Sequence, residues 1–293
     1  MENTRSRSEK IDIQGLRYHV RHWGPADAPA VFFLHGRMDC SPTFQFLVDA
    51  LKQSWHVIAP DWRGYGESEW LSHPYWFPDY YADLHGLLDH YSPGKPARLV
   101  AHSMGANIAG SYAGAQPERI SQLVMLDFLG LKPAVDEDSP TLIAAWLKDL
   151  RKDPPLAIYP NCEALASRLM DLNPRLSTDR AAFLSWNVGR LRSDGLIEMA
   201  CDPWHRLPSP VVYHAEDAMA SWKKIEAPVL LLIAEHGLIK HRFGNDLPEF
   251  NRRIACFRNL QTVAISDSGH NVQHDQPELV AAAIEKFLSR DQV

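Results

Sequence analysis

The segment Arg98-Leu-Val-Ala-His-Ser-Met-Gly-Ala-Asn107 places a serine directly after a short apolar run. The run predicts a buried strand, and the small residues after Ser103 predict a helix. A strand that turns sharply into a helix needs small neighbours, because the backbone there is tight and strained. The usual spacing of such a nucleophile-bearing turn is G-x-S-x-G; here Ala101 replaces the first glycine and Gly105 keeps the second. The simpler interpretation is a serine that only caps a helix.

Similar apolar runs recur on both sides of this segment, each bounded by turn residues. Because they do not alternate apolar with polar residues, they are typical of strands buried on both faces, as in a parallel sheet. Apolar residues at helical spacing lie between them, and this alternation predicts an open, mostly parallel α/β sheet flanked by helices. The predicted strands are 31–34, 57–59, 99–101, 123–126, 229–234 and 262–265, and the clearest helical stripes are 44–51, 80–91 and 280–288.

Two parts of the chain depart from this rhythm. Residues 10–23 read as two polar strands with a turn at Gly15, which predicts an antiparallel edge. Residues 129–222 are helical in pattern and rich in proline and tryptophan, which predicts an insertion between two strands of the sheet. The expected organisation is therefore a core of residues 1–128 and 223–293 with a helical cap of residues 129–222.

Composition narrows the class of protein. The chain has 293 residues, 45% hydrophobic and 23% charged, with a net charge of −6, which is ordinary for a globular protein and does not favour nucleic acid as a partner. Its four cysteines form no C-x-x-C pair, so neither a zinc site nor a disulfide framework is expected. No apolar leader and no run long enough to span a membrane is visible, so we expect a cytoplasmic protein that does not bind membranes.

Three further segments carry chemistry-bearing residues. His35-Gly-Arg37 follows a predicted strand and begins a loop that can present a backbone N–H group. The segment 61–68, DWRGYGES, is a glycine-rich loop in which Asp61 and Arg63 are expected to be structural. Ser266-Asp-Ser-Gly-His270 follows the last predicted strand and precedes the C-terminal helix.

Taken in order, these four motifs resemble the α/β-hydrolase superfamily over about residues 10–130 and 223–290. The stretches HGRMDC, LVMLDFLGL, LPSP and AEHGL more narrowly resemble the serine hydrolase-like proteins. The resemblance implies an α/β-hydrolase fold, with the insertion as the cap over the active site. It also implies an enzyme that needs no cofactor and no metal.

The resemblance assigns roles to single residues. Ser103 matches the nucleophile, His270 the general base, and the backbone N–H groups of Arg37 and Met104 the oxyanion hole. A serine hydroxyl is a poor nucleophile until an imidazole accepts its proton, and fixed amides stabilise the oxyanion that forms. The expected reaction is hydrolysis of carboxylic esters or similar small acyl compounds through an acyl-enzyme.

The sequence offers two candidates for the third triad member. The family usually places an aspartate after the seventh strand, but Gly237 stands there in the turn Ala234-Glu-His-Gly237. Asp127, at the end of the strand 123–126, is the favoured acid, as in certain haloalkane dehalogenases. Glu235, two residues before the usual place, is the alternative.

Other functions remain open at this stage. Gly237 supports a non-catalytic binding protein on the same fold, and the same triad also serves C–C bond hydrolases and lyases. A serine at position 103 argues against epoxide hydrolase or dehalogenase chemistry, which needs a carboxylate nucleophile. His270 and His274 have helical spacing, but the pattern lacks the glutamate of a zinc motif. Aromatic residues between 70 and 81 suggest a small, mainly apolar or aromatic substrate, and a monomer or homodimer is expected.

Overall fold

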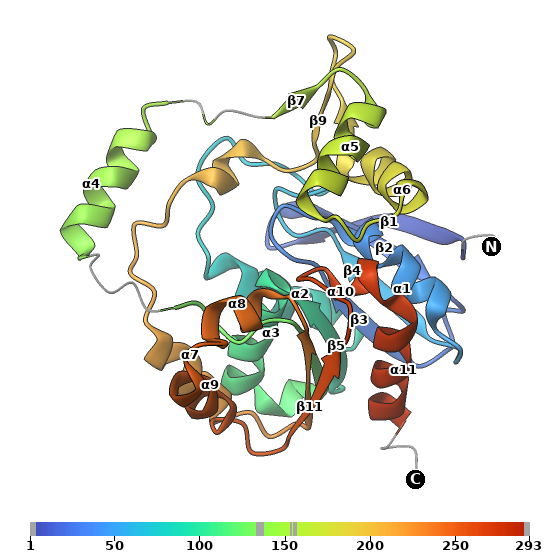
Figure 1. The fold of residues 1–293 in the computed structure, drawn as a ribbon, viewed down its shortest axis with the longest axis vertical. Coiled ribbons are helices and arrows are strands. Elements are labelled where there is room, and N and C mark those ends of the chain that lie inside the picture. Colours follow the sequence, from blue (N-terminus) through green and yellow to red (C-terminus); the bar gives the residue numbers. More distant parts are fainter. Residues whose placement is uncertain (1–3, 133–137, 153, 155–156, 290–293) are drawn as a thin grey trace.

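The computed structural model describes residues 4–132, 138–152, 154 and 157–289. These residues form an eight-stranded sheet in the order β1-β2-β4-β3-β5-β6-β10-β11 (Figure 1). The strands are β1 (Ser6–Ile13), β2 (Leu16–Trp23), β3 (Ala30–Leu34), β4 (His56–Pro60), β5 (Ala97–His102), β6 (Ile120–Leu126), β10 (Val229–Ala234) and β11 (Leu260–Ile265).

The sheet has one antiparallel edge and a parallel body. β1 and β2 pair as the predicted hairpin, and β2 joins β4 antiparallel. From β4 to β11 every pairing is parallel, so the carboxyl ends of these strands meet at one edge of the sheet. Each of the six apolar runs forms a strand of this sheet, which confirms the predicted fold class.

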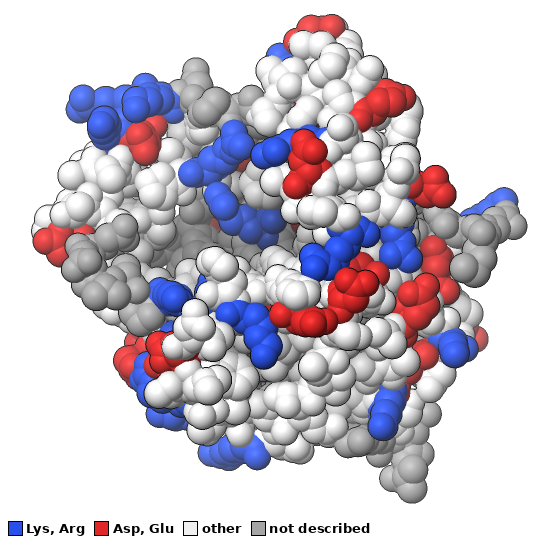
Figure 2. Space-filling model, viewed as in Figure 1, with Lys and Arg blue, Asp and Glu red and all other residues white. Residues whose placement is uncertain are grey.

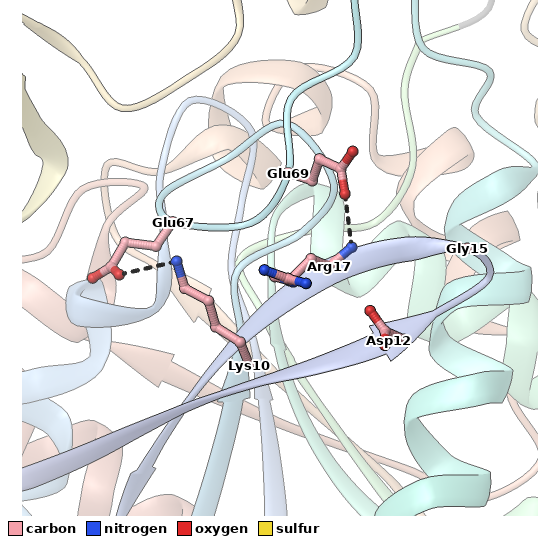
Figure 3. Close-up of a pocket in the computed structure, with 6 residues that line it drawn as sticks. All are labelled: Lys10, Asp12, Gly15, Arg17, Glu67 and Glu69. Carbon is pink, nitrogen blue, oxygen red and sulfur yellow. Dashed lines mark hydrogen bonds and ion pairs between the residues drawn. The ribbon is translucent and has the colours of Figure 1, made fainter.

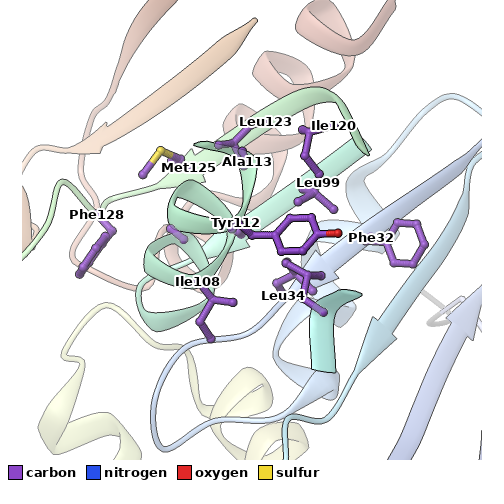
Figure 4. Packing of buried hydrophobic residues seen from close by; sticks show 14 of the residues in the cluster. Phe32, Leu34, Leu99, Ile108, Tyr112, Ala113, Ile120, Leu123, Met125 and Phe128 are labelled. Atoms are coloured by element: carbon purple, nitrogen blue, oxygen red, sulfur yellow. The ribbon is translucent and has the colours of Figure 1, made fainter. Parts of the chain in front are cut away.

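Helices cover both faces of the sheet. On one face, α2 (Asp79–Tyr91), α3 (Met104–Ala115) and α7 (Ala215–Trp222) pack with a large apolar cluster, part of which is seen in Figure 4. On the other face, α1 (Gln45–Ala50) and α11 (Pro277–Leu288) pack against a second cluster. A short α10 (Val272–Asp275), together with α8 (Leu238–Phe243) and α9 (Leu247–Ile254), completes the core. This burial holds the strand ends in fixed register, which is what a catalytic site built on several strands requires.

The insertion after β6 differs from the purely helical cap that the sequence predicts. It contains α4 (Ser139–Asp149), α5 (Cys162–Leu172), α6 (Thr178–Val188) and the 3₁₀ helix η3 (Pro203–Arg206), but also a separate antiparallel sheet in the order β7-β9-β8. Its strands, β7 (Ile158–Tyr159), β8 (Gly189–Leu191) and β9 (Ile197–Met199), are only two or three residues long, which is too short to show a periodic pattern. None of them joins the main sheet.

The predicted boundary at residue 222 also differs from the packing. α7 lies within the predicted cap, yet it packs against α3, and Trp222 is fully buried in the main core. A Cβ atom on Gly110 of α3 would lie 3.1 Å from Trp222 Nε1, so the two helices approach closely. By packing, the core therefore begins again before residue 215. No helix among the described residues is long and apolar enough to cross a membrane.

Candidate active site

Ser103 lies at the sharp turn between β5 and α3. Its φ of 52° and ψ of −113° lie outside the regions that most residues adopt, and such strain is typical of functional turns. A Cβ atom on Gly105 would lie 2.8 Å from the carbonyl oxygen of His35, so only glycine lets α3 start this close to the end of β3. Gly105 therefore allows the serine to lie beside the loop that follows β3.

His270 bridges Ser103 and Asp127. His270 Nε2 lies 2.9 Å from Ser103 Oγ, and His270 Nδ1 lies 2.8 Å from Asp127 Oδ2. Both distances are within hydrogen-bond range, and the ring is oriented with one nitrogen toward each partner. The three residues come from the ends of β5 and β6 and from the loop after β11, at the carboxyl edge of the sheet.

Asp127 is held from several sides. Its side chain is fully buried, and its oxygens accept hydrogen bonds from the backbone N–H groups of Leu238 (2.6 Å) and Ala234 (3.2 Å). Its own φ is 46°, a further strained position at this edge. These backbone donors satisfy the buried oxygens and fix the carboxylate beside His270.

Gly237 is explained by this arrangement. Its φ of −90° is open to any residue, so backbone freedom is not the reason for glycine. A Cβ atom at this position would lie 2.6 Å from Asp127 Cγ and 2.5 Å from Ala234 Cβ. The carboxylate of Asp127 thus fills the space in which a side chain at position 237 would lie. Gly237 therefore no longer supports a non-catalytic protein.

Glu235 lies elsewhere. Its side chain is half-exposed, Oε2 accepts from the backbone N–H of Asp267 at 2.8 Å, and Oε1 is 3.8 Å from His236 Nε2. Of the two carboxylates considered from the sequence, it is Asp127 that the structure brings to His270.

The loop after β3 is organised by His35, which is fully buried. Its Nδ1 bonds the carbonyl oxygen of Gly36 at 2.7 Å, and its Nε2 bonds the backbone N–H of Trp62 at 2.9 Å. Burial lowers the pKa of His35 to about 4, so the ring is neutral and donates from Nδ1 while Nε2 accepts. Since carbonyl and N–H point in opposite directions across a trans peptide, the N–H of Arg37 points away from His35.

The two expected oxyanion donors belong to the loop after β3 and to the start of α3. A Cβ atom on Gly36 would lie 3.1 Å from Ser103 Cβ, so the loop that carries Arg37 touches the serine. Met104 is the first residue of α3, where backbone N–H groups have no partner within the helix. The helix dipole also favours negative charge at that end.

The side chain of Arg37 does not pair with Asp39, the carboxylate two residues further along the chain. Its Nη2 donates instead to the carbonyl oxygen of His205 in η3, at 2.7 Å. His205 lies between two aromatic rings, Tyr65 at 4.0 Å and Tyr75 at 3.7 Å between ring centroids. Arg37 therefore joins the core loop to the cap.

His102 contacts the triad, although the alternation of a strand predicts that it faces away. Its Nε2 lies 3.0 Å from the carbonyl oxygen of His270, and the two rings are 4.7 Å apart. Burial keeps the pKa of His102 well below its usual value, so the ring is neutral and donates from Nε2. It fixes the main chain that carries His270. No local sequence signal predicts this contact, because the partners are 168 residues apart.

Asp61 and Arg63 act as structural residues in the glycine-rich loop. Asp61 accepts from the backbone N–H groups of Ser41 and Glu67 and bonds His19 Nδ1 at 2.7 Å. Arg63 binds Asp83 through Nε and Nη2 at 2.5 and 2.6 Å. These bonds tie the loop to neighbouring elements and leave no role in the triad for either residue.

Two other features lie outside the triad and lack the character of a catalytic site. Among the described residues, no group of three or more His, Cys, Asp or Glu is arranged to hold a metal ion, and His274 Nε2 bonds Thr43 Oγ1 at 2.6 Å. An open hollow at the β1–β2 hairpin has walls of mixed charge and contains no triad residue (Figure 3). It is lined by Lys10, Asp12, Gly15, Arg17, Glu67 and Glu69.

The chain is similar in sequence and in fold to known proteins. A "Serine hydrolase-like protein" of Danio rerio is 29% identical over 280 residues, which cover 91% of this chain and 83% of the relative. The 2-(acetamidomethylene)succinate hydrolase of Mesorhizobium japonicum is 24% identical and covers 96% of this chain and 95% of its own. A hypothetical protein from Pseudomonas aeruginosa PAO1 shares the fold, with a TM-score of 0.84, 24% identity and coverage of 97% and 99%. The family model for the alpha/beta hydrolase fold matches residues 29–277, so the protein belongs to the α/β-hydrolase fold family.

Proposed function

We propose that this protein is a serine hydrolase that cleaves carboxylic esters or similar small acyl compounds without a cofactor. The observation that carries the proposal is the continuous pair of hydrogen bonds from Ser103 Oγ through His270 to Asp127. A nucleophile, a base and an acid that orients the base are the parts that acyl transfer needs. The hydrolases among its relatives support the reaction class.

The reaction follows from the two sides of the imidazole. His270 Nε2 takes the proton of Ser103 as Oγ attacks the substrate carbonyl, and Asp127 holds Nδ1–H and stabilises the imidazolium. The backbone N–H groups of Arg37 and Met104 bind the oxyanion. Loss of the leaving group, which takes the proton from His270, gives an ester on Ser103. Water, activated by the same histidine, hydrolyses that ester and frees the serine.

The first experiment tests whether the serine is activated. We expect a fluorophosphonate probe to label the wild-type protein and not Ser103→Ala, because labelling needs a serine whose proton has an acceptor. Short-chain 4-nitrophenyl esters should be turned over, and Ser103→Ala should abolish turnover without change in the unfolding transition. Undiminished hydrolysis by Ser103→Ala would contradict the mechanism.

The same experiment separates the alternatives. A folded protein that neither reacts with the probe nor cleaves esters would favour a binding protein on this fold. A labelled protein that cleaves vinylogous diketones but no ester would favour C–C bond hydrolysis by the same residues.

A further inference from the structure

Arginine side chains from three separate parts of the chain, Arg37, Arg175 and Arg242, lie close to the triad. A Cβ atom on Gly269, which precedes His270, would lie 3.7 Å from Arg175 Nη1. Figure 2 shows Lys and Arg side chains gathered round a hollow between α4, η3 and α8, at the face where cap and core meet. Arg37 follows Gly36, and a Cβ atom placed on Gly36 would lie 3.1 Å from Ser103 Cβ. Arg242 of α8 donates to the carbonyl oxygen of Gly130 at 2.8 Å. The positive charge is local, since the whole chain carries −6.

The partners of these arginines differ in charge. Arg175 lies 3.5 Å from the carboxylate of Asp267, so its charge is partly compensated. Arg37 and Arg242 donate to backbone carbonyl oxygens, and neither forms an ion pair within the described part of the chain. A carbonyl oxygen orients a guanidinium group but does not neutralise it. Arg37 is the exposed one of these two, and it is next to the nucleophile.

The carboxylates nearest to Arg37 in sequence and in the cap are engaged elsewhere. Asp39 accepts from the backbone N–H of Cys40 at 2.9 Å, and burial raises its pKa to about 7. Asp202 accepts from Tyr75 Oη at 2.7 Å and from the backbone N–H of Trp204 at 3.0 Å. Burial raises the pKa of Asp202 as well. The positive charge of Arg37 is therefore available to a ligand.

The support behind Arg37 is rigid. The carbonyl that accepts from Nη2 belongs to His205, whose ring is stacked between Tyr65 and Tyr75 and whose Nε2 bonds the carbonyl oxygen of Arg63 at 3.1 Å. One end of the guanidinium is thus fixed, while the rest of its planar set of donors is free to bind. A guanidinium held in this way loses little conformational freedom when it binds a carboxylate.

We propose that Arg37 binds a carboxylate of the substrate, so that the enzyme prefers anionic esters, such as half-esters of dicarboxylic acids, over neutral ones. This inference rests on the proposed serine hydrolase function. The backbone N–H of Arg37 and its side chain act on one substrate: the amide meets the oxyanion, and the guanidinium meets a carboxylate a few bonds away. The preference is for a charged end on an otherwise apolar acyl chain.

The test compares two esters of equal chain length, 4-nitrophenyl hexanoate and the mono-4-nitrophenyl ester of adipic acid. We expect wild-type kcat/KM, divided by the uncatalysed rate, to favour the adipate at least tenfold, and the preference to fall as salt screens the charge. Arg37→Gln should lower the adipate-to-hexanoate ratio at least tenfold, and Arg37→Lys should lower it less. The ratio is the readout, because the backbone of residue 37 belongs to the proposed oxyanion hole.

A matched control is Arg258→Gln, an exposed arginine just before β11, at the opposite edge of the sheet, whose ratio should stay at the wild-type value. An equal loss on both esters in Arg37→Gln, or an adipate preference that survives the substitution, would overturn the inference while ester cleavage stands. If the proposed serine hydrolase function itself were wrong, neither ester would be cleaved and the fluorophosphonate would not label Ser103. These results are distinct from those that overturn the inference about Arg37.

Discussion

Gly237→Ala tests the assignment of Asp127 most directly, because it displaces the acid without substituting any triad residue. The new Cβ would lie 2.6 Å from Asp127 Cγ, about 1 Å short of ordinary contact, and 2.5 Å from Ala234 Cβ. Asp127 cannot retreat freely, since Leu238 N–H and Ala234 N–H hold its oxygens. The carboxylate must therefore shift relative to His270 Nδ1.

The size of the effect follows from that shift. A misplacement of about 1 Å in a catalytic group can cost roughly 10²-fold in rate, or about 2.7 kcal/mol of activation free energy. Replacing Asp127 by Asn should cost more, roughly 10⁴-fold, as for the acid of other triads. We expect kcat of Gly237→Ala on a 4-nitrophenyl ester to lie between wild type and Asp127→Asn, with KM changed little.

Two controls make this prediction specific. Gly86→Ala, in the middle of α2, meets only the side chains of Ile13 and Gln14, away from the triad, and should leave kcat unchanged. In an Asp127→Gly background, where the carboxylate is gone and only the contact with Ala234 Cβ remains, adding Gly237→Ala should cost less than it does in wild type. This is the non-additivity expected of groups in contact. Equal effects of Gly237→Ala with and without the carboxylate, or a folded Gly237→Ala with full kcat, would refute the reasoning.

Two further predictions concern stability. Burial lowers the pKa of His35 and of His274 to about 4, so these two groups bind more protons in the unfolded chain than in the native state between pH 6.5 and 4. Asp39, whose pKa burial raises to about 7, has the opposite effect over this range and offsets about one of them. The stability that each neutral histidine contributes should be complete above pH 6.5 and should be lost as the pH drops toward 4, by about 3 kcal/mol of unfolding free energy for each histidine. Urea titrations at pH 7, 5.5 and 4.5 measure this loss, and a flat profile would contradict it. Arg63→Ala leaves the buried Asp83 carboxylate without its cation and should cost about 3–5 kcal/mol in the same assay. Asp79→Asn, which removes the half-exposed partner of Arg63, should cost at most about 1 kcal/mol.

The sequence predicts the sheet well because its strands are buried on both faces. Runs such as 123–126 and 229–234 are wholly apolar, and a parallel body is the arrangement that buries them. The same rule fails for β7–β9, where strands of two or three residues are set by their packing in the cap rather than by a pattern. The sequence also misplaces α7. Its helical pattern and its tryptophan are like those of the insertion, but Trp222 packs into the core.

The site is predictable where a residue's role depends on its place along a strand. Ser103 and Asp127 each follow an apolar run, so the topology alone brings them to one edge of the sheet. Contacts that join distant loops are different. The bond from His102 to the His270 carbonyl and the bond from Arg37 to the His205 carbonyl each span 168 residues, and nothing in either local sequence indicates them.

The triad acid can be placed after β6, at position 127, or after the neighbouring β10, at position 237. In this protein the carboxylate at position 127 occupies the space that a side chain at position 237 would need. β6 and β10 pair in parallel, so residues after their carboxyl ends reach the same side of His270. Asp127 φ is 46°, which glycine adopts without strain, and position 237 has a φ open to aspartate. Exchanging the two residues, Asp127→Gly with Gly237→Asp, removes the clash with Asp127 and returns one carboxylate to the same region. The new Cβ still lies 2.5 Å from Ala234 Cβ, so the loop must shift slightly to accept it. We therefore expect the exchange to recover at least tenfold of the activity that Asp127→Gly loses, measured as kcat on a 4-nitrophenyl ester. An exchanged protein that folds but stays as inactive as Asp127→Gly would mean that Asp127 acts through its particular backbone position and not through the space it fills.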